Sequence, residues 1–231
     1  LFTASFIIIP INLLQVTGLS ASQQWHIYLP TLMIGFVLSL IGIGFAERKQ
    51  QIKPFFVSGV ALLLISQLLL WGSTTYPSLI AIGLTVFFSG FSLLEAFMPS
   101  LVSRTAPLAL KGTALGIYSC AQFSGIFAGG ALGGYLYGQF HFPGVYILCL
   151  TLAAIWLIVS LLMQSPRLVV TQLWRLPLTA QSTWPELAQK LHVIPGMIEV
   201  TFEDGIAYLK MERKTLSHPD YQRLKVQVSS P

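Results

Sequence analysis

Long apolar runs separated by short polar turns fill the chain up to about residue 164. A membrane-spanning helix needs about 20 apolar residues. The first run, residues 1–14, is shorter than that, so we interpret it as the end of a truncated helix. The runs that are long enough to cross a bilayer are 27–46, 54–72, 78–102, 110–137 and 143–163. The pattern therefore predicts an all-α membrane domain of six helices over residues 1–164.

The pattern changes from about residue 165 onward, where strand-like and helix-like stretches alternate. LVVTQLWR (168–175) is rich in β-branched and aromatic residues and predicts a strand. Thr183 followed by Glu186 forms a capping box for a helix over 184–192. Residues 218–224 predict a short helix, and Val-Gln-Val at 226–228 predicts a last strand.

Between these stretches, two alternating runs flank Asp204-Gly205, a strong signal for a β-hairpin. The alternation places Ile198, Val200 and Phe202 on one face of the first hairpin strand. The resulting order, β-α-β-β-α-β, predicts a small α+β domain of the ferredoxin-like kind over residues 165–231.

Charge is scarce and unevenly placed along the chain. Only 9% of the residues are charged and 54% are hydrophobic, against about 25% charged in a soluble domain. The turns at 15–26, 72–78 and 138–143 contain no Lys or Arg. The alternate turns and the exit from the last run carry the basic residues Arg48, Lys49, Lys53, Arg104, Lys111 and Arg167.

This asymmetry predicts an orientation, because basic loops stay on the cytoplasmic side of a membrane. We expect the first run to point outward and residues 165–231 to lie in the cytoplasm. The net charge of +5 reflects these one-sided loops, so the expected partner is the lipid bilayer and not nucleic acid.

One carboxylate, Glu95, lies inside an apolar run, about nine residues before Arg104. At about 1.5 Å per helical residue this places it near mid-membrane, where acids are costly and usually face a cavity or a partner. Glu95 is therefore a candidate proton carrier, with a structural acid as the alternative. Pro99 lacks an N–H and leaves the Glu95 carbonyl without its helical donor, which favours a kink or gate there.

The next run, 110–137, is rich in small residues at intervals of four. Such rows let helix backbones approach closely in lipid, so we interpret them as helix-packing positions; they include Gly112, Gly116, Gly125, Gly129 and Gly133. Tyr118 and Gln122 lie four apart on one face and are candidates to line a cavity.

The sequence offers little for other chemistry. Its four histidines are scattered and its two cysteines lie in apolar runs, so we expect no metal site and no cofactor. Motifs for nucleophilic catalysis and nucleotide binding are missing, so an enzyme is not expected.

These features together resemble the major facilitator superfamily, in its drug-efflux-type branch. LLEAFMPSLVSRTAP (93–107) and KGTALGIYSCAQFSGIFAGGALGG (111–134) are similar to helices ten and eleven of that family, and AERKQQIK (46–53) to its basic loop between helices eight and nine. IPGMIEVTFEDGIAYLKMERK (194–214) resembles the cytoplasmic ferredoxin-like domain that YajR-type members add after helix twelve.

The resemblance implies that residues 1–164 are helices 7–12 of a twelve-helix fold, and that the N-terminal six-helix half is missing from this chain. It implies alternating access between two rocking halves and proton-coupled efflux, as in an antiporter of the bacterial inner membrane. Glu95 and Pro99 match the acid and proline of helix ten, and Gln122 matches a position of helix eleven. Residues implied to latch the cytoplasmic helix ends are Glu47, Arg48, Lys49, Arg104 and Lys111.

Two functions remain open at this point. The first is a secondary active transporter that exports small amphipathic molecules, with protons as coupling ions and Glu95 as their candidate carrier. The second is a membrane-embedded sensor or scaffold whose cytoplasmic domain is regulatory.

Overall fold

The computed structural model describes residues 1–231 apart from 50, 77, 165–168, 176–183, 204 and 230–231. It divides into two compact units. The first contains residues 1–100 and 117–165, and the second contains residues 101–116 and 166–231. Two helices, α4 and α5, have residues in both units.

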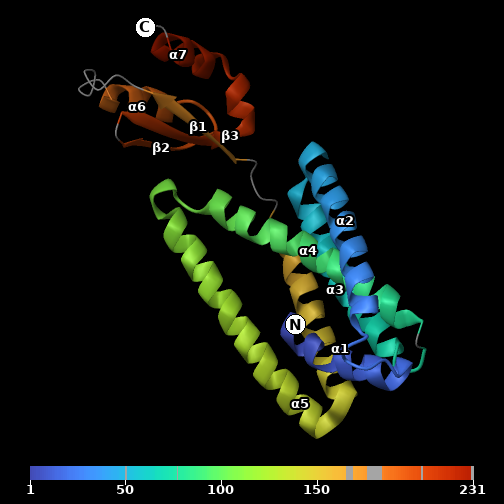
Figure 1. Ribbon diagram of the computed structural model, residues 1–231. Coiled ribbons are helices and arrows are strands. Elements are labelled where there is room, and N and C mark those ends of the chain that lie inside the picture. The colour runs from blue at the N-terminus through green and yellow to red at the C-terminus, as the bar shows by residue number, and fades with distance from the viewer. Residues whose placement is uncertain (50, 77, 165–168, 176–183, 204, 230–231) are drawn as a thin grey trace. The chain divides into compact units, whose positions relative to one another are not determined.

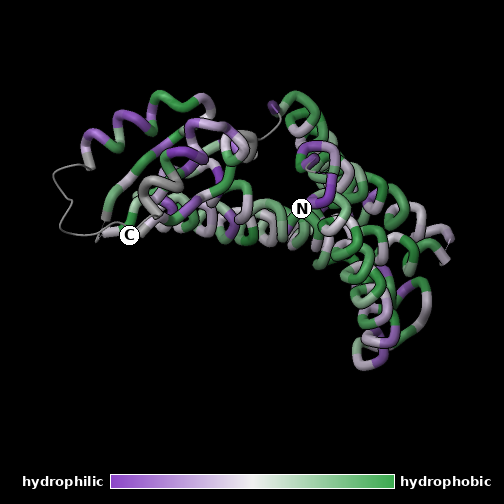
Figure 2. The backbone as a smooth tube through the Cα atoms, turned by 90° about the horizontal axis from the view of Figure 1, so that it is seen from above, coloured by the Kyte–Doolittle hydropathy of each residue, from purple (hydrophilic) through white to green (hydrophobic). Residues whose placement is uncertain are grey.

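The first unit is built from helices that coincide with the apolar runs (Figure 1). They are α1 (Phe2–Thr17), α2 (Trp25–Lys49), α3 (Ile52–Gly72), α4 (Leu79–Thr105) and α5 (Lys111–Leu162). In the described part of the chain, four helices are long and apolar enough to cross a membrane, and α1 is shorter. Figure 2 shows apolar residues along most of the length of these helices.

Helix α5 is a folded-back pair of limbs. It spans 52 residues, and at His141 its backbone leaves the helical region, with φ 53° and ψ −146°. Positive φ is uncommon for a residue other than glycine, and Pro143 follows two residues later. The chain therefore reverses direction at this point, with the limbs 111–140 and 142–162 on either side of the break (Figure 1). The polar stretch 138–143, which the sequence suggests as a connection, contracts to this single break.

Helices α1 and α3 run parallel, as two hydrogen bonds between their side chains show. The Ser5 hydroxyl donates to Gln67 Oε1 over 3.1 Å, and Asn12 Nδ2 donates to Ser73 Oγ over 2.9 Å. Position numbers rise together along both helices, so the two helices point the same way. Helix α2, which lies between them in the sequence, must therefore point the opposite way in an up-and-down arrangement.

Helices α3 and α4 run antiparallel and approach each other closely. A Cβ at Gly90 would lie 2.8 Å from the carbonyl oxygen of Gly59, closer than real Cβ atoms come. Near the other end of the pair, Gly83 faces Leu70. Small residues allow this approach, which in lipid gains stability through van der Waals packing. The sequence rows in run 110–137 do not reveal these two positions.

In its described residues, the second unit contains a small α+β tail of three strands and two α-helices. The strands are β1 (Val169–Arg175), β2 (Met197–Glu203) and β3 (Ile206–Glu212). The strands form one antiparallel sheet in the order β1-β3-β2. The remaining elements are α6 (Trp184–His192), the 3-10 helices η1 (Leu108–Leu110) and η3 (Arg213–Ser217), and α7 (Pro219–Ser229).

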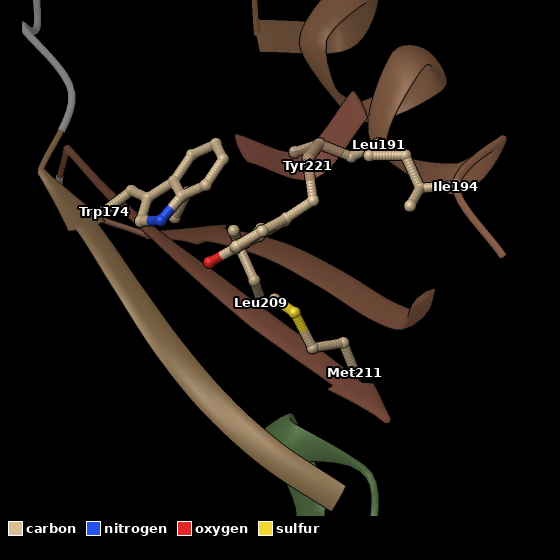
Figure 3. Packing of buried hydrophobic residues seen from close by; sticks show 7 residues of the cluster. Trp174, Leu191, Ile194, Leu209, Met211 and Tyr221 are labelled. Carbon is tan, nitrogen blue, oxygen red and sulfur yellow. The ribbon is translucent and has the colours of Figure 1, made fainter. Parts of the chain in front are cut away.

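The core of the tail lies on one face of this sheet (Figure 3). Alternate residues of β3 point into it, and they pack with Trp174 of β1 and Tyr221 of α7. The buried members of this cluster are Trp174, Leu191, Ile194, Ala207, Leu209, Met211 and Tyr221. Burial of these apolar side chains is the main force that holds the tail together.

Two details of the tail differ from the sequence predictions. Residues 226–228 belong to α7, so the expected last strand is wrong: a helix that begins at Pro219, a favoured first-turn residue, continues through Val-Gln-Val and overrides its strand propensity. Ile198 does not share the core face with Val200 and Phe202. The register of β2 shifts between Met197 and Glu199, which leaves Ile198 41% exposed while Met197 packs against the core.

Candidate functional site

A cavity of about 470 Å³ opens within the first unit, between α1, α3, α4 and α5. Its walls are mostly apolar, with Phe91 and Met98 from α4 and Trp156 from the second limb of α5. Glu95 is the one charged side chain among the described residues that line it. Tyr118 and Gln122 of the first α5 limb complete its polar part. An apolar cavity with a few polar groups is the usual form of a small-molecule site.

The carboxylate of Glu95 is held by Gln122 across this cavity. Gln122 Nε2 donates a hydrogen bond to Glu95 Oε1 over 2.9 Å. Glu95 itself is exposed to the open space, and Gln122 and Tyr118 are half-buried. The structure thus brings all three residues of the expected proton and substrate pathway into one cavity, where the acid can meet a ligand.

Pro99 lies inside α4, and the helix continues through it to Thr105. A proline cannot donate a backbone hydrogen bond to the residue four positions earlier. The residue four positions earlier is Glu95, so the carbonyl of the cavity acid has no donor from position 99. The helix is therefore weakened one turn from the carboxylate without being broken.

The expected cytoplasmic latch residues lie at helix ends. Arg48 and Lys49 close the last turn of α2, with Glu47 just before them. Arg104 lies in the last turn of α4, and Lys111 begins α5. In the described part of the chain no ion pair joins Glu47 to Arg48 or Lys49, so the latch stays a prediction.

The five glycines expected to pack helices divide into two groups. A Cβ at Gly133 would lie 2.9 Å from the Cα of Ala4, and at Gly129 it would lie 3.6 Å from Thr3, so both face α1. Among the described residues, nothing lies within 4 Å of such a Cβ at the other three, which are Gly112, Gly116 and Gly125.

A set of buried polar side chains escapes the sequence analysis. Asn12 donates to Tyr146 Oη over 3.3 Å as well as to Ser73, and Ser5 lies 3.5 Å from the sulfur of Cys149 as well as bonding Gln67. We name the group Ser5, Asn12, Gln67, Ser73 and Tyr146 the polar ladder. All five are at most 1% exposed. The available signal was a serine and an asparagine seven apart in run 1–14, which is two helical turns.

Comparison with known proteins places these features in a family. Residues 1–194 match the Major Facilitator Superfamily. The chain is 35% identical over 216 residues to the inner membrane transport protein YajR of Escherichia coli K12, which covers 93% of this chain and 47% of that protein. It is 31% identical over 161 residues to an uncharacterized transporter of Buchnera aphidicola, covering 68% of this chain and 40% of that protein.

The chain thus spans about half the length of the curated relatives that it matches. Its apolar helices and these relatives make it an integral membrane protein. The match extends over the membrane helices, the cavity with Glu95, and most of the tail. The chain therefore belongs to the major facilitator superfamily.

Proposed function

We propose that the protein is a secondary active transporter that exports small amphipathic molecules in exchange for protons. The observation that carries this proposal is the cavity of about 470 Å³, with apolar walls and the single carboxylate of Glu95. Sites for small molecules span about 300–1,000 Å³. Apolar walls suit the hydrophobic part of a substrate, and the carboxylate suits a positive charge.

Glu95 is the proposed point of coupling. A proton and a positively charged substrate compete for one carboxylate, so binding of either one releases the other. Gln122 keeps the carboxylate oriented through its 2.9 Å hydrogen bond, and Tyr118 lines the same wall. Pro99 supplies a weak point in α4 at which this wall can move.

The proposed architecture is a six-helix half that rocks against a second half. α1 to α4 and the two limbs of α5 supply six helical segments, and the chain spans 47% of its relative's length. Both facts support a partner half of similar size and alternating access between the halves. In this proposal the helices lie in a bacterial inner membrane. The basic residues at the ends of α2 and α4 favour the cytoplasmic side of that membrane for the tail. The tail is a ferredoxin-like variant in this proposal, without its last strand.

Transport by the full-length protein in proteoliposomes tests the proposal. An imposed proton gradient should drive movement of a lipophilic cationic dye such as ethidium, and Glu95→Gln should abolish that movement. Glu186→Gln, which removes an exposed carboxylate from α6, is the matched control and should transport normally. Unchanged proton-driven transport by Glu95→Gln would contradict the assigned role.

A second candidate is a membrane-embedded sensor whose tail is the working part. The observation in its favour is that the tail has an apolar core of its own. Deletion of residues 165–231 separates the two functions. Transport that survives the deletion supports the transporter, with the tail in a regulatory role. If neither the full-length protein nor the truncated protein transports, the sensor is the remaining candidate.

A further inference from the structure

One lysine of the tail, Lys210, is buried on the face of the sheet opposite the tail core. Residues 207, 209 and 211 of β3 point into the tail core, so Lys210 points to the opposite, outer face. That face holds no part of the core cluster, yet Lys210 is only 4% exposed. Lysine is almost never fully buried without a partner, so a specific contact must cover it.

The contact is the turn between α4 and α5, which belongs to the same compact unit as the tail. Lys210 Nζ donates a hydrogen bond to the backbone carbonyl of Ala106, the residue that directly follows α4. Carbonyls at the C-terminal end of a helix lack helical donors, and a cation is favourable there. Ala106 is itself only 7% exposed, so both sides of the contact are desolvated.

A second contact lies beside the first and has the opposite charge. Glu199 of β2 is the direct cross-strand partner of Lys210 in the sheet register. Both of its carboxylate oxygens accept from the backbone N–H of Leu108, at 3.0 and 3.3 Å. Leu108 begins η1, so its N–H has no helical acceptor.

We propose that Glu199 and Lys210 form a two-point clamp by which the tail binds the α4–α5 turn of its own chain. The ammonium group of Lys210 donates to the carbonyl of Ala106, and the carboxylate of Glu199 accepts from the N–H of Leu108. The charges of the pair therefore match the backbone acceptor and donor that the turn offers. Because neighbouring strands hold the two side chains side by side, the turn is bound in one orientation.

The clamp has a consequence for the cavity, and this part alone rests on the proposed function. The α4–α5 turn connects the helix that carries Glu95 to the limb that carries Gln122. A tail that grips this turn restrains the movement of the two helices that line the cavity. The tail then acts as a brake on the transport cycle.

Hydrogen exchange of the full-length protein in detergent tests the clamp without any transport assay. In Glu199→Ala the amide of Leu108 should exchange about tenfold faster, which is the factor for about 1.4 kcal/mol, near the lower end for a hydrogen bond to a charged group. Lys210→Met keeps the apolar stem and removes the donor, and it should also speed exchange in residues 106–110. Lys210→Arg keeps a donor and should restore protection.

Two variants on the exposed side of α6, Glu186→Ala and Lys190→Met, are the matched controls and should leave the turn protected. Continued protection of the β3 amides shows that the tail is folded in each variant. If the turn exchanges at the wild-type rate in both Glu199→Ala and Lys210→Met while β3 stays protected, the clamp is wrong. Protection that disappears on dilution would also overturn it, because the turn would then be bound by the tail of a second copy.

Discussion

Gln122 Nε2 lies 2.9 Å from Glu95 Oε1, and this hydrogen bond joins α4 to the first limb of α5 across the cavity. The two residues are 27 positions apart, so the bond reports tertiary packing and not local structure. A double-mutant cycle should detect it. We expect Glu95→Ala and Gln122→Ala to show a coupling energy of about 1 kcal/mol, because each single change already removes the bond.

The cycle is measured by unfolding the full-length protein in mixed detergent micelles. Ile126 also lines the cavity from α5, but its side chain has no group that can form a hydrogen bond with the acid, so Ile126→Ala with Glu95→Ala is the control. That pair should be additive within about 0.5 kcal/mol. Additivity of the Glu95 and Gln122 changes would show that the bond does not persist in solution.

Two neighbouring glycines of α5 should respond in opposite ways to the same substitution. Gly133→Ala would place a methyl group 2.9 Å from the Cα of Ala4, and we expect it to destabilise the protein by about 1–3 kcal/mol through overpacking. At Gly134 nothing among the described residues lies within 4 Å, so Gly134→Ala should leave stability unchanged or raise it by up to about 1 kcal/mol. Thermal unfolding in detergent compares them, and equal effects would rule out the α1 contact.

The polar ladder makes a stability prediction for α1. Asn12→Ala removes the donor to both Ser73 Oγ and Tyr146 Oη, and leaves a buried tyrosine hydroxyl without that partner. We expect a loss of about 2–3 kcal/mol, since an unmade buried hydrogen bond carries the desolvation cost of the group that remains. Thr151→Val is the control: Thr151 is exposed, and its hydroxyl donates to the carbonyl of Ile147 within the same helix. It should cost less than about 0.5 kcal/mol.

Alkaline pH should loosen the tail through Tyr221. Burial raises the pKa of Tyr221 above its ordinary value of 10.0, so the hydroxyl ionises more readily in the unfolded tail. Its contribution to stability is complete below pH 10 and is lost as the pH rises through the raised pKa. Protease cleavage of the tail in the full-length protein should therefore accelerate above about pH 10.

Tyr221→Phe should flatten that acceleration, because phenylalanine keeps the ring and cannot ionise. Tyr208→Phe, at a position for which β3 alternation points away from the core, corrects for the pH dependence of the protease. If the Tyr221→Phe tail is cleaved with the wild-type pH profile, the ionisation of Tyr221 is not the cause.

The helices could be predicted from the sequence because their cause is local. An apolar run of about 20 residues is sufficient to define a span, and α2, α3 and α4 cover the expected runs. The end of the tail could not be predicted in the same way. Val-Gln-Val at 226–228 has strand propensity, and only the helix that begins at Pro219 and buries Tyr221 in the core decides its conformation.

The candidate site could be predicted from the sequence only in part, because some of its contacts are not local. An acid in an apolar run is conspicuous, so Glu95 could be singled out, and Gln122 and Tyr118 share a helix face. The contacts of Asn12 could not be foreseen, because they depend on which helices become neighbours. The contacts of Lys210 could not be foreseen either. The alternation of β3 predicts an exposed side chain at this position, and in the structure the α4–α5 turn covers it.

The polar ladder also fixes how far α1 can slide. Ser5 bonds Gln67 and Asn12 bonds Ser73, so a slip of α1 along α3 by one turn, about 5.4 Å, would break both bonds at once. These side chains are 0–1% exposed, so solvent has little access to replace the two bonds. Van der Waals packing between apolar helices permits many alignments of similar energy, whereas paired hydrogen bonds permit one. The ladder thus fixes one axial alignment of α1 against α3. Any rocking of the bundle must therefore carry α1 and α3 together as one rigid unit.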